Sequence, residues 1–227
     1  MKSLLPLLLV AAAAAQAQTA KVKAPADSFS FTVDNHMIAR DVDDFDAMSY
    51  GIKAKVWDDV RMTLSFADGG SDRFTLASGT NLKIDANLFS IGAEYDLHVG
   101  GPGALTLSLA YAQTTGKGAD GTTGDAFRNQ QLVMGARYAM ALGEGFTATL
   151  SANKFLSDFD PDPVFSNASA RSALVQRYDG SPVSVGLTLA YAPTENVTLH
   201  VTYATEDSLF GLAGADNTIS FGLRASF

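Results

Sequence analysis

The most regular feature of the chain is an alternation of apolar and polar residues with a period of two. Such a period predicts β-strands, because successive side chains of a strand point to opposite faces. In the last ten residues, Ile219, Phe221, Leu223, Ala225 and Phe227 alternate with Thr218, Ser220, Gly222, Arg224 and Ser226. The same pattern covers residues 60–66, 105–111, 132–140, 183–191 and 197–203. The chain is therefore expected to be all-β, with strands that have one apolar and one polar face.

The connections between these segments alternate in length. Short turns rich in Gly, Pro, Asn and acidic residues are expected at 58–59, 99–103, 142–145 and 193–196. Longer polar loops are expected at 35–46, 67–80, 114–126, 157–172 and 205–216. Together they predict about ten strands if 28–34 forms the first one. Because that segment offers only Phe29, Phe31 and Val33 as apolar positions, eight strands remain an alternative.

Aromatic residues are expected at the two ends of the strands. Those near the short turns or near the long loops are Trp57, Tyr95, Tyr111, Tyr138, Tyr191 and Tyr203. Two aromatic girdles with aliphatic residues between them are typical of a barrel that crosses a bilayer, whereas a soluble sandwich buries its aromatic residues in the core. The other face of the strands supports this prediction.

Charged residues occupy positions on the polar face of the strands. They are Lys53, Lys55, Arg61, Glu94, Asp96, Arg137 and Arg224. A dry core would not tolerate so many charges, so this face is expected to line a polar lumen. The fold predicted is a transmembrane, antiparallel, up-and-down β-barrel.

The N-terminus has the pattern of a secretory signal peptide. Lys2 precedes an apolar stretch at 4–15, and Ala15-Gln16-Ala17 is a small-x-small cleavage pattern. The domains expected are a signal peptide at 1–17 and a single barrel at 18–227. The chain has no cysteine, and its formal charge of −8 argues against nucleic acid as a partner.

These features resemble the small outer-membrane β-barrel and porin-like proteins of Gram-negative bacteria. The resemblance rests on the signal pattern, on the repeated alternation at 105–112 and 187–192, and on the terminal strand with Phe221, Leu223 and Phe227. It implies a bacterial outer-membrane location, contact with outer-membrane lipid and lipopolysaccharide, and a terminal strand recognised by the barrel-assembly machinery. The chain is much shorter than the large trimeric porins, so their oligomeric state is not implied.

The function expected first is a porin-like passive channel for small hydrophilic solutes. Five lumen cations against two anions would favour anions modestly. The alternative is a closed barrel in which these charges pair with one another and the extracellular loops act as an anchor or adhesin. Neither function requires a cofactor, a metal or catalysis.

A protease at the extracellular rim is a minor alternative. The omptin proteases use Asp-x-Asp and Asp-x-His pairs to activate water, and similar pairs occur here at 34–36 and 158–162. Their chain order is reversed, and acidic residues are common in this sequence. We therefore expect no catalytic residues and no metal site.

Overall fold

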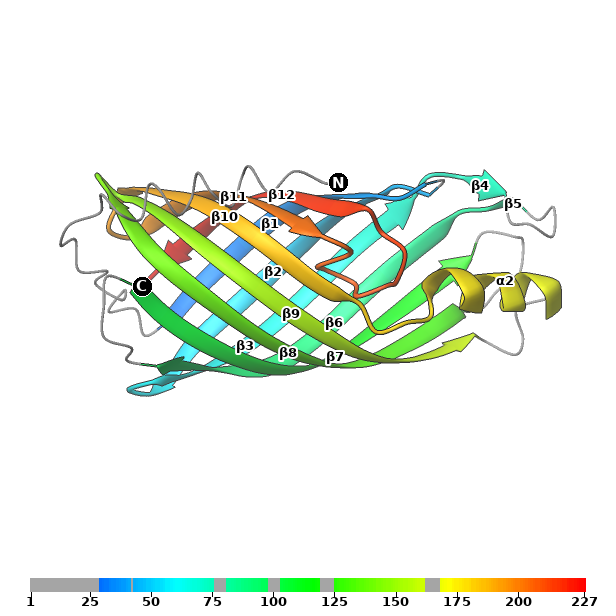
Figure 1. The fold of residues 1–227 in the computed structure, drawn as a ribbon, viewed down its shortest axis with the longest axis horizontal. Helices are drawn as coiled ribbons and strands as arrows, with labels where there is room; N and C mark the ends of the chain where they lie inside the picture. Colours follow the sequence, from blue (N-terminus) through cyan, green and yellow to red (C-terminus); the bar gives the residue numbers. More distant parts are fainter. Residues whose placement is uncertain (1–28, 42, 76–80, 98–102, 119–124, 162–167) are drawn as a thin grey trace, which may run out of the picture.

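The computed structural model describes residues 29–41, 43–75, 81–97, 103–118, 125–161 and 168–227. The predicted signal peptide at 1–17 and residues 99–102 of the turn predicted at 99–103 lie outside these residues. The described chain forms a closed barrel of ten antiparallel strands (Figure 1). The strands are β1 (Phe29–Ala39), β2 (Phe45–Trp57), β3 (Val60–Ser71), β6 (Ile84–Leu97), β7 (Gly103–Gly118), β8 (Asp125–Gly143), β9 (Phe146–Pro161), β10 (Val183–Thr194), β11 (Val197–Thr205) and β12 (Asn217–Ser226).

The first strand closes the barrel, so the count of ten is confirmed over the alternative of eight. β1 pairs with β2 on one side and with β12 on the other, in a register that runs from Ser30 opposite Ser226 to Ala39 opposite Asn217. Closure leaves no open strand edge, and a bilayer could not satisfy the polar groups of such an edge.

Two small elements lie outside the barrel wall. β4 (Phe74–Thr75) pairs with β5 (Asn81–Leu82), and α2 spans Ala168–Tyr178. Figure 1 shows both at the end of the barrel opposite the C-terminus. We call this the loop end, and the end with the tight turns the turn end. Within the described residues, no helix is long and apolar enough to cross a membrane.

The wall of the barrel has an apolar outer face over most of its length. Side chains such as Leu109, Leu150 and Phe221 point away from the lumen and are about half exposed. The positions between them, such as Ser108, Ser151 and Ser220, point into the lumen. A soluble protein has its apolar side chains inside and its polar side chains outside. The reverse arrangement in this barrel suits a wall surrounded by lipid.

At the loop end, several segments that were predicted as loops belong to strands, and their apolar side chains point inward instead of outward. β1 and β2 include most of 35–46, while β7, β8 and β9 continue into 114–118, 125–126 and 157–161. There the inward side chains are apolar, as with Ile38, Phe45 and Ile84, and outward ones such as Asp46 are polar and exposed. We call this part the collar. The expectation of purely polar loops was wrong because these segments extend the sheet around a core of their own.

Candidate functional site

A network of charged side chains lines the lumen toward the turn end. Glu94 on β6 has a side chain only 8% exposed, and it binds three cations. Lys53 Nζ lies 2.7 Å from its Oε2, Arg137 Nη2 lies at 2.6 Å and Arg61 Nε at 3.4 Å. Asp96, two residues further on, accepts hydrogen bonds from Arg61 and from Thr106 Oγ1. We call Lys53, Arg61, Glu94, Asp96 and Arg137 the charge cluster.

The charge cluster contains five of the seven lumen charges expected from the sequence. Of the other two, Lys55 lies 3.4 Å from Asp58 at the exposed turn between β2 and β3. Arg224 lies on β12, in register between Thr32 and Thr198. The cations of the cluster are therefore held by carboxylates, which reduces the net field on which an anion preference would depend.

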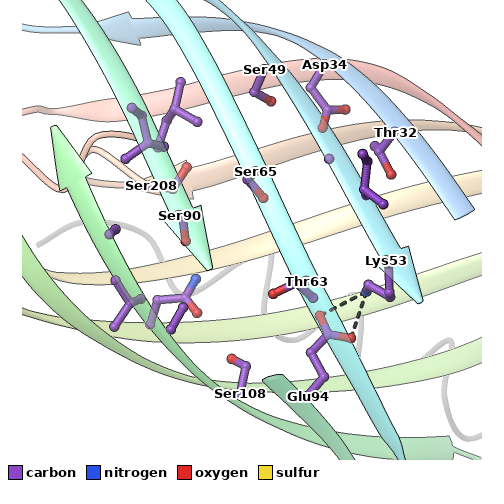
Figure 2. Close-up of a pocket in the computed structure, with 18 of the residues that line it drawn as sticks. Thr32, Asp34, Ser49, Lys53, Thr63, Ser65, Ser90, Glu94, Ser108 and Ser208 are labelled. Carbon is purple, nitrogen blue, oxygen red and sulfur yellow. Dashed lines mark hydrogen bonds and ion pairs between the residues drawn. The ribbon is translucent and has the colours of Figure 1, made fainter. Parts of the chain in front are cut away.

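A cavity of about 350 Å³ lies in the lumen beside the charge cluster. Figure 2 shows that hydroxyl side chains surround much of it, with Lys53 and Glu94 nearby. The polar residues that line it are Thr32, Asp34, Ser49, Lys53, Thr63, Ser65, Ser90, Glu94, Ser108, Asn153 and Ser208. Val133, Phe155 and Leu209 provide part of its apolar lining. We call this cavity the hydroxyl chamber.

Two histidines are hydrogen-bonded near the chamber. Asp34, Gly222 and His200 lie side by side on β1, β12 and β11. Because Gly222 has no side chain, the Asp34 carboxylate passes over it and lies 2.6 Å from His200 Nε2. On β1, His36 Nε2 lies 2.8 Å from Ser49 Oγ. Both histidines therefore act as paired lining residues in this structure.

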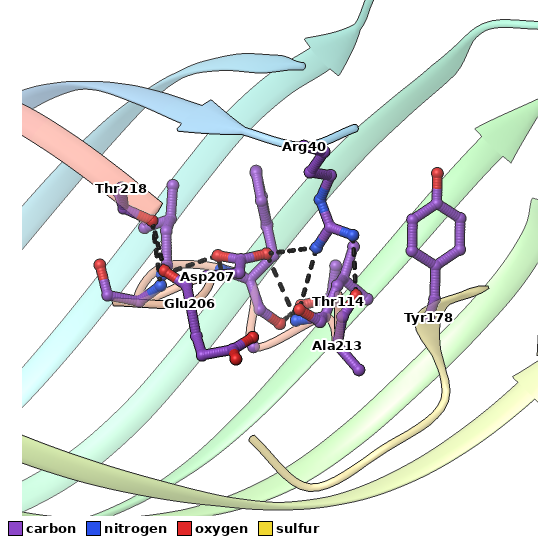
Figure 3. Close-up of polar contacts among 12 residues, drawn as sticks. Arg40, Thr114, Tyr178, Glu206, Asp207, Ala213 and Thr218 are labelled. Carbon is purple, nitrogen blue, oxygen red and sulfur yellow. Dashed lines mark hydrogen bonds and ion pairs between the residues drawn. The ribbon is translucent and has the colours of Figure 1, made fainter. Parts of the chain in front are cut away.

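The segment 206–216, between β11 and β12, folds into the loop end of the lumen. We call it the mouth segment. Arg40 donates from Nη1 to Ala213 O (2.7 Å) and from Nη2 to Leu212 O (2.9 Å), and it pairs with Asp207 at 3.5 Å. Figure 3 shows Arg40 and Thr114 directed at this segment. Both side chains of the Arg40–Asp207 pair are only 1% exposed, so this ion pair is fully removed from water.

Further contacts hold the backbone of the mouth segment. Gln131 Nε2 donates to Phe210 O at 2.8 Å and to Gly211 O at 3.1 Å, and Thr114 Oγ1 also donates to Phe210 O. Gly211 has a φ of +65°, a backbone conformation that favours glycine. The side chains of Phe210 and Leu212 are fully buried in the core of the collar. The segment was expected to be a polar loop, although its sequence places the large apolar residues Leu209, Phe210 and Leu212 around Gly211.

The helix α2 covers the same core. Leu174 and Tyr178 are fully buried, and Tyr178 packs against Phe127 with ring centroids 5.7 Å apart. Arg177 and the Tyr178 hydroxyl both donate to Asp43, which precedes β2. Burial, and then the nearby Asp43 carboxylate, raise the pKa of Tyr178 well above its ordinary value. At the loop end, the lumen is thus filled by a packed core.

Comparisons with known proteins show similarity of fold only. No protein-family model matches the chain, and no curated protein matches its sequence. The β domain of the Bordetella autotransporter BrkA is 10% identical with a TM-score of 0.50, over 88% of this chain and 100% of that one. The similarity to that barrel agrees with the closed sheet and the apolar outer wall of this chain. These observations together decide the class of protein. The chain is an outer-membrane β-barrel.

Other similar structures are more distant in shape. An outer-membrane channel from Pseudomonas putida F1 is 10% identical with a TM-score of 0.49, covering 89% of this chain and 96% of that one. The NanC porin is 8% identical with a TM-score of 0.43, covering 86% and 100%. These likenesses are too weak to indicate what the barrel transports or binds.

The aromatic residues predicted at the membrane interfaces are exposed, apart from the half-buried Tyr138. Near the turn end, Trp57 is 71% exposed, Tyr95 is about half exposed, and Tyr191 stacks on Phe146 with centroids 4.6 Å apart. Tyr138 is half-buried, and its ring lies over Gly103 on β7. Tyr111 and Tyr203 are exposed further along the wall, toward the loop end.

The predicted insertion signal lies on the last strand. Phe221 and Leu223 point outward from β12, and Phe227 follows the strand. The backbone N–H of Phe227 donates to Phe29 O at 2.9 Å, so the end of the chain is attached to the first strand. Recognition of this strand by the assembly machinery stays a prediction.

The residue pairs that suggested a rim protease are not brought together. Asp34 and His36 point into the lumen, where they bond to His200 and Ser49. Asp158 and Asp160 are exposed on the other face of β9, opposite Gln130 and Arg128 of β8. Acids on the outer wall cannot share a water molecule with residues inside the lumen. Among the described residues, no group of acids and histidines forms a metal site.

Proposed function

We propose that the barrel is a porin-like channel for small hydrophilic solutes, and that its mouth segment closes it in this conformation. The hydroxyl chamber is the observation that supports this most. Barrels of about eight strands are usually filled by their own side chains. Here a cavity of about 350 Å³ remains, because many of the inward positions at this level carry the small side chains of serine and threonine.

The mouth segment can act as a removable closure because it is not a strand of the sheet. It leaves the wall at the end of β11 and returns at the start of β12. Side chains of Arg40, Gln131 and Thr114 hold its backbone carbonyls. Its displacement would open the lumen without breaking the hydrogen bonds between the strands.

The substitution Arg40→Ala tests this function. It removes two hydrogen bonds and leaves Asp207 buried without its cation, a loss of about 3–5 kcal/mol for comparable buried pairs. We expect the wild-type protein to be almost silent in a planar bilayer, and the variant to give discrete conductance steps. Arg73→Ala is the matched control, because Arg73 is exposed at the same end of the barrel.

Folding of each variant is checked by the gel-mobility shift on heating. If Arg40→Ala does not fold, Asp207→Asn removes the same ion pair more conservatively. A silent membrane from a folded variant would contradict the channel function.

A second function is favoured by the packing of the mouth. Phe210, Leu212, Leu174 and Tyr178 are fully buried there, as in a permanent core. A barrel closed in this way would serve as an anchor or adhesin through its exposed collar and loops. Silence of both the wild-type and the Arg40→Ala protein would support this alternative.

A further inference from the structure

We infer that the hydroxyl chamber selects small neutral solutes that carry several hydroxyl groups, of the size of a monosaccharide. This inference names the substrate class and rests on the proposed channel function. It differs from the anion preference expected from the sequence. Three features of the chamber lead to it: the pairing of its charges, its free hydroxyl groups and its apolar side.

Each charged side chain beside the chamber is already in an ion pair. Glu94 binds Lys53, Arg61 and Arg137 at distances of 2.6–3.4 Å. Asp34 lies 2.6 Å from His200. A charged solute would lose part of its hydration on entry and would have to break one of these pairs to gain a counter-charge. A neutral solute avoids both losses.

The hydroxyl groups of the chamber are free to bind a solute. Thr32, Thr63, Ser65, Ser90 and Ser108 line it from four strands: β1, β3, β6 and β7. In the part of the chain that the structure describes, none of these five side chains makes a hydrogen bond. Each hydroxyl can both donate and accept, so together they can replace the water around a polyhydroxylated molecule. Figure 2 shows the labelled serines and threonines around a common space.

The remaining lining suits the carbon skeleton of such a solute. Val133 on β8 and Phe155 on β9 provide apolar surface on the barrel wall, and Asn153 provides an amide. A sugar has hydroxyl groups at its edge and C–H groups on its faces, so it matches a lining of this kind. The volume of about 350 Å³ is near the lower end of the usual range for small-molecule sites and limits the occupant to one small molecule.

Liposome swelling with matched solutes tests the inference. Full-length protein with the Arg40→Ala substitution is placed in liposomes, which are then exposed to isosmotic glucose, gluconate or glucosamine hydrochloride at mildly acidic pH. The three solutes have nearly the same size and differ in charge. We expect glucose to enter roughly tenfold faster than either charged solute.

A double substitution tests whether the hydroxyl groups cause this preference. Ser90→Ala with Ser108→Ala removes two of them, and we expect the preference for glucose to fall roughly tenfold, the equivalent of two ordinary hydrogen bonds. The control is Ser30→Ala with Ser226→Ala. These two serines face each other on β1 and β12 and do not line the chamber.

The outcomes separate this inference from the proposed function. Faster entry of gluconate or glucosamine, or an unchanged preference in the Ser90 and Ser108 variant, would overturn the inference and leave the channel intact. Failure of all three solutes to enter through a folded Arg40→Ala or Asp207→Asn protein would overturn both.

Discussion

At the scale of single residues, Glu94 is the centre of the polar lumen. Its carboxylate is the shared partner of three cations that come from β2, β3 and β8. Because the side chain is only 8% exposed, its charge is stable there only through these partners. Removing the charge would leave Lys53 and Arg137 without a carboxylate partner among the described residues, and Arg61 with Asp96 alone.

The substitution Glu94→Gln tests this role. We expect the free energy of unfolding to fall by about 3 kcal/mol, in the range for breaking a buried ion pair. Urea unfolding in detergent, followed by gel mobility, measures the change. Glu144→Gln in the exposed turn after β8 is the control and should have little effect. An equal effect of both substitutions would show that the charge cluster does not stabilise the barrel.

At the scale of elements, α2 and the mouth segment are attached to the barrel at two neighbouring points. Asp43 accepts hydrogen bonds from Arg177 and Tyr178 of α2, while Arg40, three residues earlier, binds the mouth segment. The Arg40 guanidinium also lies over the Tyr178 ring, 5.2 Å from its centroid. The short connection between β1 and β2 therefore holds both parts of the closure.

This attachment predicts an alkaline sensitivity. Burial raises the pKa of Tyr178, and so does the Asp43 carboxylate, so the folded state keeps this proton at a pH where the unfolded chain has lost it. The contribution of Tyr178 to stability is therefore complete below about pH 10, the ordinary tyrosine pKa, and decreases as pH rises above it.

The comparison of wild-type protein with Tyr178→Phe measures this contribution. The difference between their urea midpoints should be constant from neutral pH to about pH 10 and should shrink above it. Tyr50→Phe is the control, since Tyr50 is exposed on the outer wall. A difference that did not change with pH would contradict the role of the Tyr178 proton.

At the scale of the whole molecule, the outer wall shows where the membrane ends. Along β6 the apolar side chains point inward at Ile84 and Leu88, and outward at Phe89 and Ile91. The apolar face changes sides between Leu88 and Phe89, although the strand is continuous. The collar beyond this point has the polarity of a soluble protein, so we place it outside the bilayer.

Two lysine substitutions on β6 test this boundary. Ile91→Lys puts a charge on the apolar outer wall and should lower the free energy of unfolding in liposomes by about 2–4 kcal/mol. Asn87→Lys, on the same face four residues earlier, should change it by about 1 kcal/mol or less. Urea unfolding in liposomes, followed by gel mobility, compares them. Equal losses would place the collar inside the bilayer.

Much of the barrel could be predicted from the sequence because the information is local. A period of two assigns each side chain of a strand to a face, whatever the strand pairs with. This was sufficient for the outward direction of Tyr111 and Leu223 and for the inward direction of Glu94. The count of ten strands followed from the alternation of short and long connections.

The closed mouth and the chamber could not be predicted from the sequence, because they depend on contacts between residues far apart in the chain. Lys53 and Glu94 are 41 residues apart, and Arg40 and Leu212 are 172 apart, so only closure of the barrel brings them together. The apolar residues of the collar look like isolated exceptions in polar loops until the strands extend and surround them. The sequence alone determined which face of the strands is apolar below the collar, because that depends on neighbouring residues. The tertiary structure alone decided which lumen charges pair and that the mouth is filled, because burial depends on what closure places opposite each side chain.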